Sequence, residues 1–187
     1  MITVNTWQDF RDRPEVLEKI DFLLEKAQTD PNNRMPANYS KEKIALDFTL
    51  AVSIAERDGE PFSYSSIMHR KIFKNSARVI SRFYYHPLHK IKGLRNAEMP
   101  LKHIWRDHTI DMIEQQTEIA FELGYDGVFI SQHDKSLKFF TRMYNGLLVK
   151  SKYKDWKFKG NKLYNVCHGH ECQHMIIHKG NFYLEEA

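Results

Sequence analysis

A strand, a basic loop with a glycine and a long amphipathic helix follow one another between Arg78 and Gly146, and this order constrains the fold more than any other feature. The run ARVISRFYYHP predicts a strand over residues 77–85 that ends before Pro87. The next segment, LHKIKGLRN, places lysines and an arginine around Gly93. Apolar residues at helical spacing then predict a helix from Pro100 to about Gly124, either continuous or broken near Asp107. Positive charge and a glycine between a strand and a helix are typical of anion-binding loops.

Patterns elsewhere predict a mixed α/β (α+β) fold with a mostly antiparallel sheet flanked by helices. Asp12 is expected to cap a helix that ends near Gln28, and residues 136–144 are expected to form another. Alternating apolar residues predict a hairpin of strands 48–54 and 62–68 around an Asp-Gly turn. Further strands are expected at 128–131, 162–167 and 173–178. With 187 residues, 42% of them hydrophobic, the chain is expected to form a single domain over 1–187.

Charge is concentrated in one segment of the chain. The net charge is +4, yet residues 69–102 hold nine lysines and arginines against Glu98 alone. A basic segment that includes the glycine loop favours an anionic ligand, either a phosphorylated cofactor or a nucleic acid. A solvated basic face is the alternative.

The chain has no apolar run long enough to span a bilayer, and its first residues lack a signal-peptide pattern. We therefore expect a cytoplasmic protein without a membrane partner. Two cysteines, Cys167 and Cys172, provide no disulfide framework. The sequence leaves a homodimer open.

The order and spacing of these elements resemble the GNAT N-acetyltransferase superfamily. Pro87 precedes Gly93 by six residues, as in that family, and Lys90 stands where the family's pyrophosphate loop begins with Gln or Arg. The segment LGYDGVFIS, ending at Ser131, looks like the family's helix end and fifth strand. The resemblance implies a GNAT-like sheet whose middle strands splay apart to admit the pantetheine arm of acetyl-CoA.

The resemblance also implies an activity and a set of cofactor residues. The activity is acetyl transfer from acetyl-CoA, as co-substrate, to a primary amine that attacks the thioester directly. The implied cofactor-binding residues lie on the two central strands and in the loop: Phe83, Tyr85, Lys90, Lys92, Gly93, Leu94, Arg95 and Ser131. Arg95 replaces a small residue of the family's loop, so side-chain charge is expected to contribute more to the anion site than helix-end amides do.

Acyl transfer to an amine needs a base for the amine and an acid for the leaving thiolate. The candidates are Tyr144 as the acid, and His133 and His108 as bases. Phe140 stands at the family's tyrosine position, and Tyr144 follows one helical turn later. Glu56, acting through a water, is a further candidate base. For the histidines and Tyr144, a packing or surface role is the more common one for residues of these types.

Two other chemistries remain open. The segment Cys167–His174 holds cysteines and histidines of the kinds that bind zinc, but no second cysteine pair accompanies them, so we expect no metal. Aromatic residues among the cations of segment 69–102 are typical of a nucleic-acid surface. The alternative function is therefore a non-catalytic nucleic-acid-binding domain on a degenerate acetyltransferase fold.

Overall fold

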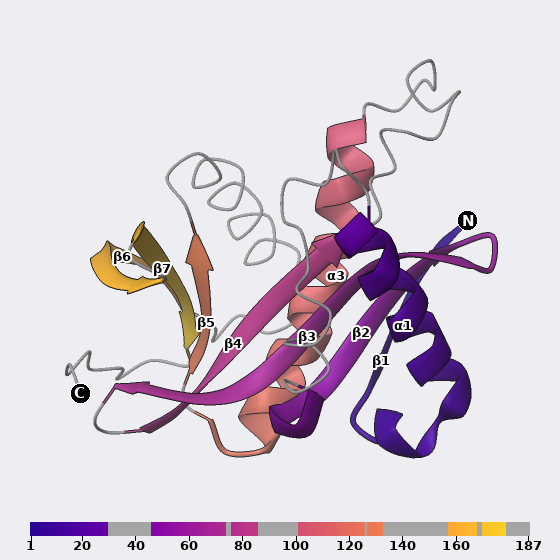
Figure 1. Ribbon diagram of the computed structural model, residues 1–187. Helices are drawn as coiled ribbons and strands as arrows, with labels where there is room; N and C mark the ends of the chain where they lie inside the picture. The colour runs from indigo at the N-terminus through magenta and orange to yellow at the C-terminus, as the bar shows by residue number, and fades with distance from the viewer. Residues whose placement is uncertain are drawn as a thin grey trace. The chain divides into compact units, whose positions relative to one another are not determined.

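The computed structural model describes residues 1–29, 46–73, 76–85, 101–125, 127–132, 157–167 and 170–178 (Figure 1). The chain forms two compact units. The first comprises Met1–Met68 and Arg82–Met112, and the second comprises His69–Ser81 and Ile113–Ala187. The prediction of a single domain stays a prediction.

In the described part of the chain, seven strands follow the hydrogen-bonded order β1-β2-β3-β4-β5-β7-β6. The pairs β1–β2, β2–β3, β5–β7 and β6–β7 are antiparallel, whereas β4–β5 is parallel. The predicted mixed fold with a mostly antiparallel sheet is confirmed. The strands are β1 (Ile2–Trp7), β2 (Thr49–Arg57), β3 (Glu60–Phe73), β4 (Ser76–Tyr85), β5 (Gly127–Gln132), β6 (Lys157–Cys167) and β7 (His170–His178).

The helices are α1 (Pro14–Thr29) and α3 (Leu101–Glu122), with short 3₁₀ turns η1 (Phe10–Asp12) and η2 (Leu46–Phe48). The predicted helix from Pro100 is continuous through Asp107 and ends at Glu122. The helix predicted at 136–144 lies outside the described residues. No helix in the described part of the chain has the length and apolarity needed to cross a membrane.

In the first unit, the two faces of strands β1–β3 carry different side chains. Large side chains on one face pack against the apolar stripe of α1. The other face meets α3 at Met112, together with Ala55 and Phe62. Figure 1 shows α1 and α3 on opposite sides of these strands. The residues of the α1 cluster are Phe10, Val16, Ile20, Leu23, Leu24, Val52, Ile54 and Tyr64.

A register shift between β2 and β3 changes which residues meet α3. Ala55 pairs with Ser63 and Glu56 with Pro61, so Phe62 is the extra residue of a β-bulge. Phe62 and Ser63 therefore both contact α3, although neighbours on a regular strand point to opposite faces.

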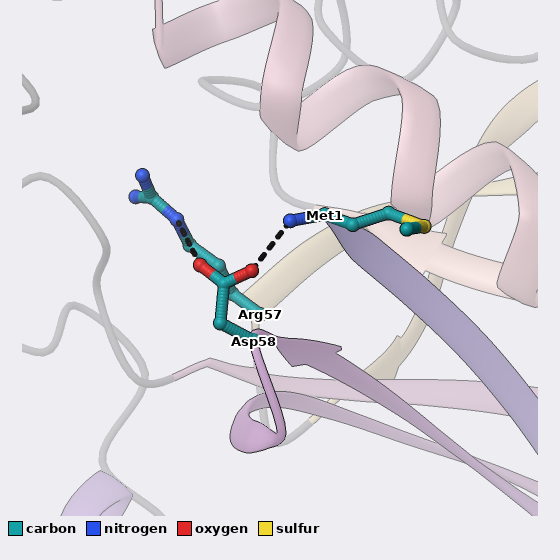
Figure 2. Close-up of polar contacts among 3 residues, drawn as sticks. All are labelled: Met1, Arg57 and Asp58. Atoms are coloured by element: carbon teal, nitrogen blue, oxygen red, sulfur yellow. Dashed lines mark hydrogen bonds and ion pairs between the residues drawn. The ribbon is translucent and has the colours of Figure 1, made fainter.

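The hairpin turn between β2 and β3 falls where the sequence predicts it. Asp58 and Gly59 have φ angles of 51° and 86°, the left-handed values that a two-residue Asp-Gly turn requires. The amino group of Met1 donates to the Asp58 carboxylate at 2.6 Å, and Arg57 lies 3.8 Å from its other oxygen (Figure 2). The hydrogen bond from the Met1 ammonium lowers the pKa of Asp58.

The start of α1 differs from the prediction by one residue. The helix begins at Pro14, so Arg13 rather than Asp12 is the residue before it, and the Arg13 carbonyl accepts from Val16 and Leu17. The Arg13 side chain donates to Asp9 at 2.9 Å, and this hydrogen bond lowers the pKa of Asp9. The difference arises because Asp12 belongs to the preceding turn η1.

In the second unit, β5 is paired along its whole length with β7, from Gly127↔His178 to Gln132↔Gln173. β7 also pairs with β6 in antiparallel register, which is irregular after Gly160 and after Tyr164. The strands predicted at 162–167 and 173–178 are confirmed as parts of β6 and β7.

Candidate functional site

The predicted cofactor residues Phe83 and Tyr85 lie near the carboxyl end of β4. Their strand is followed in the sequence by the predicted anion loop and then by α3, which begins at Leu101. β4 and β5 are in parallel register at Val79↔Val128 and Ile80↔Phe129. Ser131, the other predicted cofactor residue that lies on a strand, is on β5 opposite His174 of β7.

The remaining predicted site residues lie outside the part of the chain that the structure describes. They are the loop residues Lys90, Lys92, Gly93, Leu94 and Arg95, and the candidate catalytic residues His133 and Tyr144. Their roles stay predictions.

Of the candidates His108, His133 and Tyr144, only His108 has a side chain that the structure describes. It lies on α3 in the first unit and is only 2% exposed. Its ring meets Phe62 edge-on, with centroids 5.0 Å apart and ring planes at 78°. This T-shaped geometry is how aromatic rings commonly pack in cores. One turn further along α3, Met112 Sδ lies 3.9 Å from the Ser63 hydroxyl.

Two cross-strand pairs on the face of β2 and β3 that carries Ala55 consist of small residues. Pairing places Ser53 opposite Ser65, and Ala55 opposite Ser63, and all four are fully buried. The Ser53 hydroxyl also lies 2.7 Å from the Thr6 hydroxyl across β1 and β2. Small hydroxyl residues on this face contrast with the large apolar residues that face α1.

Glu56, the other candidate base, is held by a lysine. Lys19 Nζ on α1 lies 2.5 Å from Glu56 Oε1 near the end of β2. Glu56 is only 12% exposed, so this pair forms a partly buried link between α1 and β2.

The second unit contains a polar aromatic pair that no local sequence pattern predicts. The Tyr125 hydroxyl lies 2.8 Å from His69 Nδ1, and the ring centroids are 5.6 Å apart. Burial raises the pKa of Tyr125, so its hydroxyl keeps its proton near neutral pH. His69 is exposed and Tyr125 is half-buried.

Within the described residues, no group of three or more histidine, cysteine or acidic side chains is arranged to hold a metal. In the hairpin of β6 and β7, Cys167 pairs with His170 and Cys172 with Tyr164, so the cysteines do not face each other across the ladder. His168 lies outside the described part of the chain.

Comparison with solved structures identifies the fold. The chain is similar to a GNAT-family acetyltransferase from Brucella melitensis in complex with acetyl-CoA, at 11% identity and a TM-score of 0.53, over 100% of this chain and 94% of that one. It is also similar to an N-acetyltransferase from Staphylococcus aureus Mu50, at 10% identity and a TM-score of 0.54, over 96% and 97% of the two chains.

A putative acetyltransferase from Salmonella typhimurium, solved with its cofactor acetyl-CoA, matches at 15% identity and a TM-score of 0.50, over 100% and 98% of the two chains. No protein-family model matches the sequence, and no curated protein does. The predicted structural resemblance to GNAT acetyltransferases is therefore confirmed at the level of the fold.

Proposed function

We propose that the chain is an N-acyltransferase that transfers an acetyl group from acetyl-CoA to a primary amine. The observation that carries the proposal is the likeness in fold over nearly the whole chain to acetyltransferases, two of them solved with acetyl-CoA. The basic glycine loop supports it because it connects β4 to α3, and cations beside a glycine suit a pyrophosphate.

In this proposal, Lys90, Lys92 and Arg95 neutralise the pyrophosphate, and Gly93 allows the backbone to approach it closely. Leu94 completes the loop, and Phe83, Tyr85 and Ser131 contribute strand positions along the pantetheine arm. These contacts fix the thioester and leave its carbonyl open to attack.

The proposed reaction is a direct attack. The amine loses a proton to His133 or His108, and its nitrogen forms a bond to the acetyl carbon. The carbon–sulfur bond breaks, and the thiolate takes a proton from Tyr144. The products are an acetamide and coenzyme A, so atoms and charge balance without an oxidant. His108 is buried in the described structure. We therefore assign the role of the base to His133 before His108.

Calorimetric titration with acetyl-CoA tests the proposal. The wild-type chain is expected to bind, and Gly93→Glu is expected to weaken binding at least tenfold because it places a carboxylate at the pyrophosphate. Gln28→Glu is the matched control, since it adds the same charge at an exposed position of α1. Absence of binding by the wild-type chain, or equal binding by both variants, would contradict the proposal.

Turnover tests the assigned acid. With any amine from a panel of polyamines and lysine peptides that is acetylated, Tyr144→Phe is expected to lower kcat by about 10²-fold or more while leaving acetyl-CoA binding intact. If the wild-type chain binds nucleic acid but does not bind acetyl-CoA, the result would instead support the alternative, a non-catalytic nucleic-acid-binding domain.

A further inference from the structure

The outer side of α1 carries exposed side chains that the packing of the helix does not use. The apolar stripe that packs on β2 and β3 occupies the inner side. On the opposite side, four exposed residues recur at spacings of three and four, which places them in one row along the helix. Phe22 within this row is 43% exposed although it is a large apolar residue. We call the four residues the outer row: Glu15, Glu18, Phe22 and Glu25.

The carboxylates of the outer row are available to a cation from another molecule. Among the described residues, Glu18 and Glu25 have no ion-pair partner. The nearest lysine on the inner side, Lys19, is held by Glu56 at 2.5 Å, so its charge is compensated on the side of the sheet. The net charge of the chain is +4, but at physiological salt charges beyond about 8 Å are largely screened. The local carboxylates therefore determine what this surface attracts.

A cation already contacts the aromatic ring of the outer row. Lys26 Nζ lies over the Phe22 ring, 5.5 Å from its centroid. This distance is within the range of about 6 Å over which a ring attracts an ammonium group. Lys26 is exposed, so an ammonium from another molecule can take its place. Glu18 and Glu25 each lie one helical turn from Phe22, on either side of that place.

The spacing of the carboxylates favours a ligand with several cations. Glu18 and Glu25 are seven residues apart, about 10 Å along the helix, so one ammonium group cannot pair with both. Lysines three positions apart in an extended peptide are separated by about the same distance. Their methylene stems can also cover the edge of the Phe22 ring, while their ammonium groups reach the carboxylates.

We propose that the outer row docks a lysine-rich polypeptide, which is the acceptor of the acetyl group. The assignment of this polypeptide as acceptor rests on the proposed acetyl transfer, whose primary amine is then a lysine side chain. Charge complementarity selects this partner, because the carboxylates repel nucleic acids and anionic membranes. A small monoamine would use one carboxylate and leave the rest of the row without a role.

Fluorescence anisotropy tests the charges, with a labelled peptide that has lysine at every third position and no acetyl-CoA present. Glu18→Gln with Glu25→Gln is expected to weaken binding about fivefold, the effect of two exposed ion pairs. The matched control, Asp47→Asn with Glu60→Gln, removes two exposed carboxylates outside α1 and is expected to bind as the wild type does. Circular dichroism establishes that each variant is folded. Equal weakening in both variants would overturn the inference, because net charge alone would then explain binding.

Substitutions of Phe22 and Lys26 test the ring and are expected to act in opposite directions. Phe22→Leu keeps an apolar side chain without a π face and is expected to weaken peptide binding about twofold or more. Lys26→Gln frees the ring and removes a like charge, so it is expected to tighten binding about twofold or more. Unchanged binding in both variants, or weaker binding in Lys26→Gln, would overturn the role of the ring.

Turnover and acetyl-CoA titration separate this inference from the proposed function. In Glu18→Gln with Glu25→Gln, the KM for the peptide is expected to rise about fivefold, whereas kcat, the KM for a small monoamine and acetyl-CoA binding are expected to stay unchanged. Acetyl-CoA binding by a wild-type chain that does not bind the peptide would overturn the docking surface alone. Peptide binding without acetyl-CoA binding would overturn the assignment of the peptide as acceptor. Self-association of the wild type in sedimentation, lost in this variant, would identify a second copy as the occupant and overturn the inference.

Discussion

Gly124 ends α3 through a specific set of backbone hydrogen bonds. Its N–H donates to the Phe121 carbonyl at 3.1 Å, and the Tyr125 N–H donates to the Ala120 carbonyl at 3.0 Å. These two bonds define a Schellman motif, which requires a left-handed residue, and Gly124 has a φ of 87°. The end of this helix near Gly124, predicted from the sequence, is therefore confirmed.

Gly124→Ala is expected to destabilise the protein by about 1–2 kcal/mol, the cost of placing a Cβ in the left-handed region. A Cβ at this position meets no atom within 4 Å, so backbone strain alone sets the cost. Urea denaturation measures the loss. Gly124→Asn is the control and is expected to lose less, because asparagine tolerates this conformation. Equal stability of Gly124→Ala and wild type would contradict the assignment.

The Asp9–Arg13 pair is expected to make the stability of the fold depend on pH. The hydrogen bond from Arg13 lowers the pKa of Asp9 below its usual value in the folded protein. A carboxyl whose folded pKa is depressed contributes stability above its unfolded pKa, and this contribution is lost as the pH falls through the folded pKa. In an NMR titration, Arg13→Gln is expected to raise the pKa of Asp9, whereas Lys26→Gln is expected to leave it unchanged. An unaltered Asp9 titration in Arg13→Gln would show that the pair does not form in solution.

Two residues of α1 that are two positions apart have very different environments. Leu24 is fully buried in the cluster that joins α1 to β2 and β3, whereas Phe22 is 43% exposed. Leu24→Ala is expected to cost about 2–5 kcal/mol because it leaves a cavity. Phe22→Ala, a larger truncation, is expected to cost about 1 kcal/mol or less. Chemical denaturation of the two variants measures both losses, and a greater loss for Phe22→Ala would contradict this packing.

The sequence predicted most elements because their local signals agree. The hairpin at Asp58-Gly59, the C-cap at Gly124 and the apolar stripe of α1 each depend on neighbouring residues. β1 was not predicted because a single short run such as ITVNTW has no turn beside it and gains its stability by pairing with β2. β3 continues past Met68 because β4 pairs with it. The basic residues of this extension do not form a local strand pattern, so it was not predicted.

In the candidate sites too, features that depend on neighbouring residues were predicted, and contacts between residues far apart in the sequence were not. Charge and a glycine within six residues were enough to predict the anion loop, whose role stays a prediction. His69 and Tyr125 are 56 residues apart, so no local pattern indicates their contact. The burial of His108 depends on a bulge at Phe62, which shifts the register between two strands.

Three elements run from one unit into the other. β3 passes between them after Met68, β4 after Ser81 and α3 after Met112. Unfolding one unit alone would break α3 in its middle and leave helical backbone groups without partners. Continuity of these elements therefore favours unfolding of the whole chain in a single cooperative transition.

Hydrogen exchange on Leu24→Ala tests this cooperativity. The substitution lies in the first unit, yet the slowest amides of β5 and β7 in the second unit are expected to exchange about 30-fold faster or more. The amides of β2 are expected to show the same increase in exchange rate. A loss of about 2 kcal/mol in global stability accelerates every amide that exchanges through complete unfolding. Phe22→Ala controls for the substitution itself and is expected to change both strands little. Acceleration confined to β1 and β2 would instead show that the two units unfold independently, and the three shared elements would then have to break at the boundary.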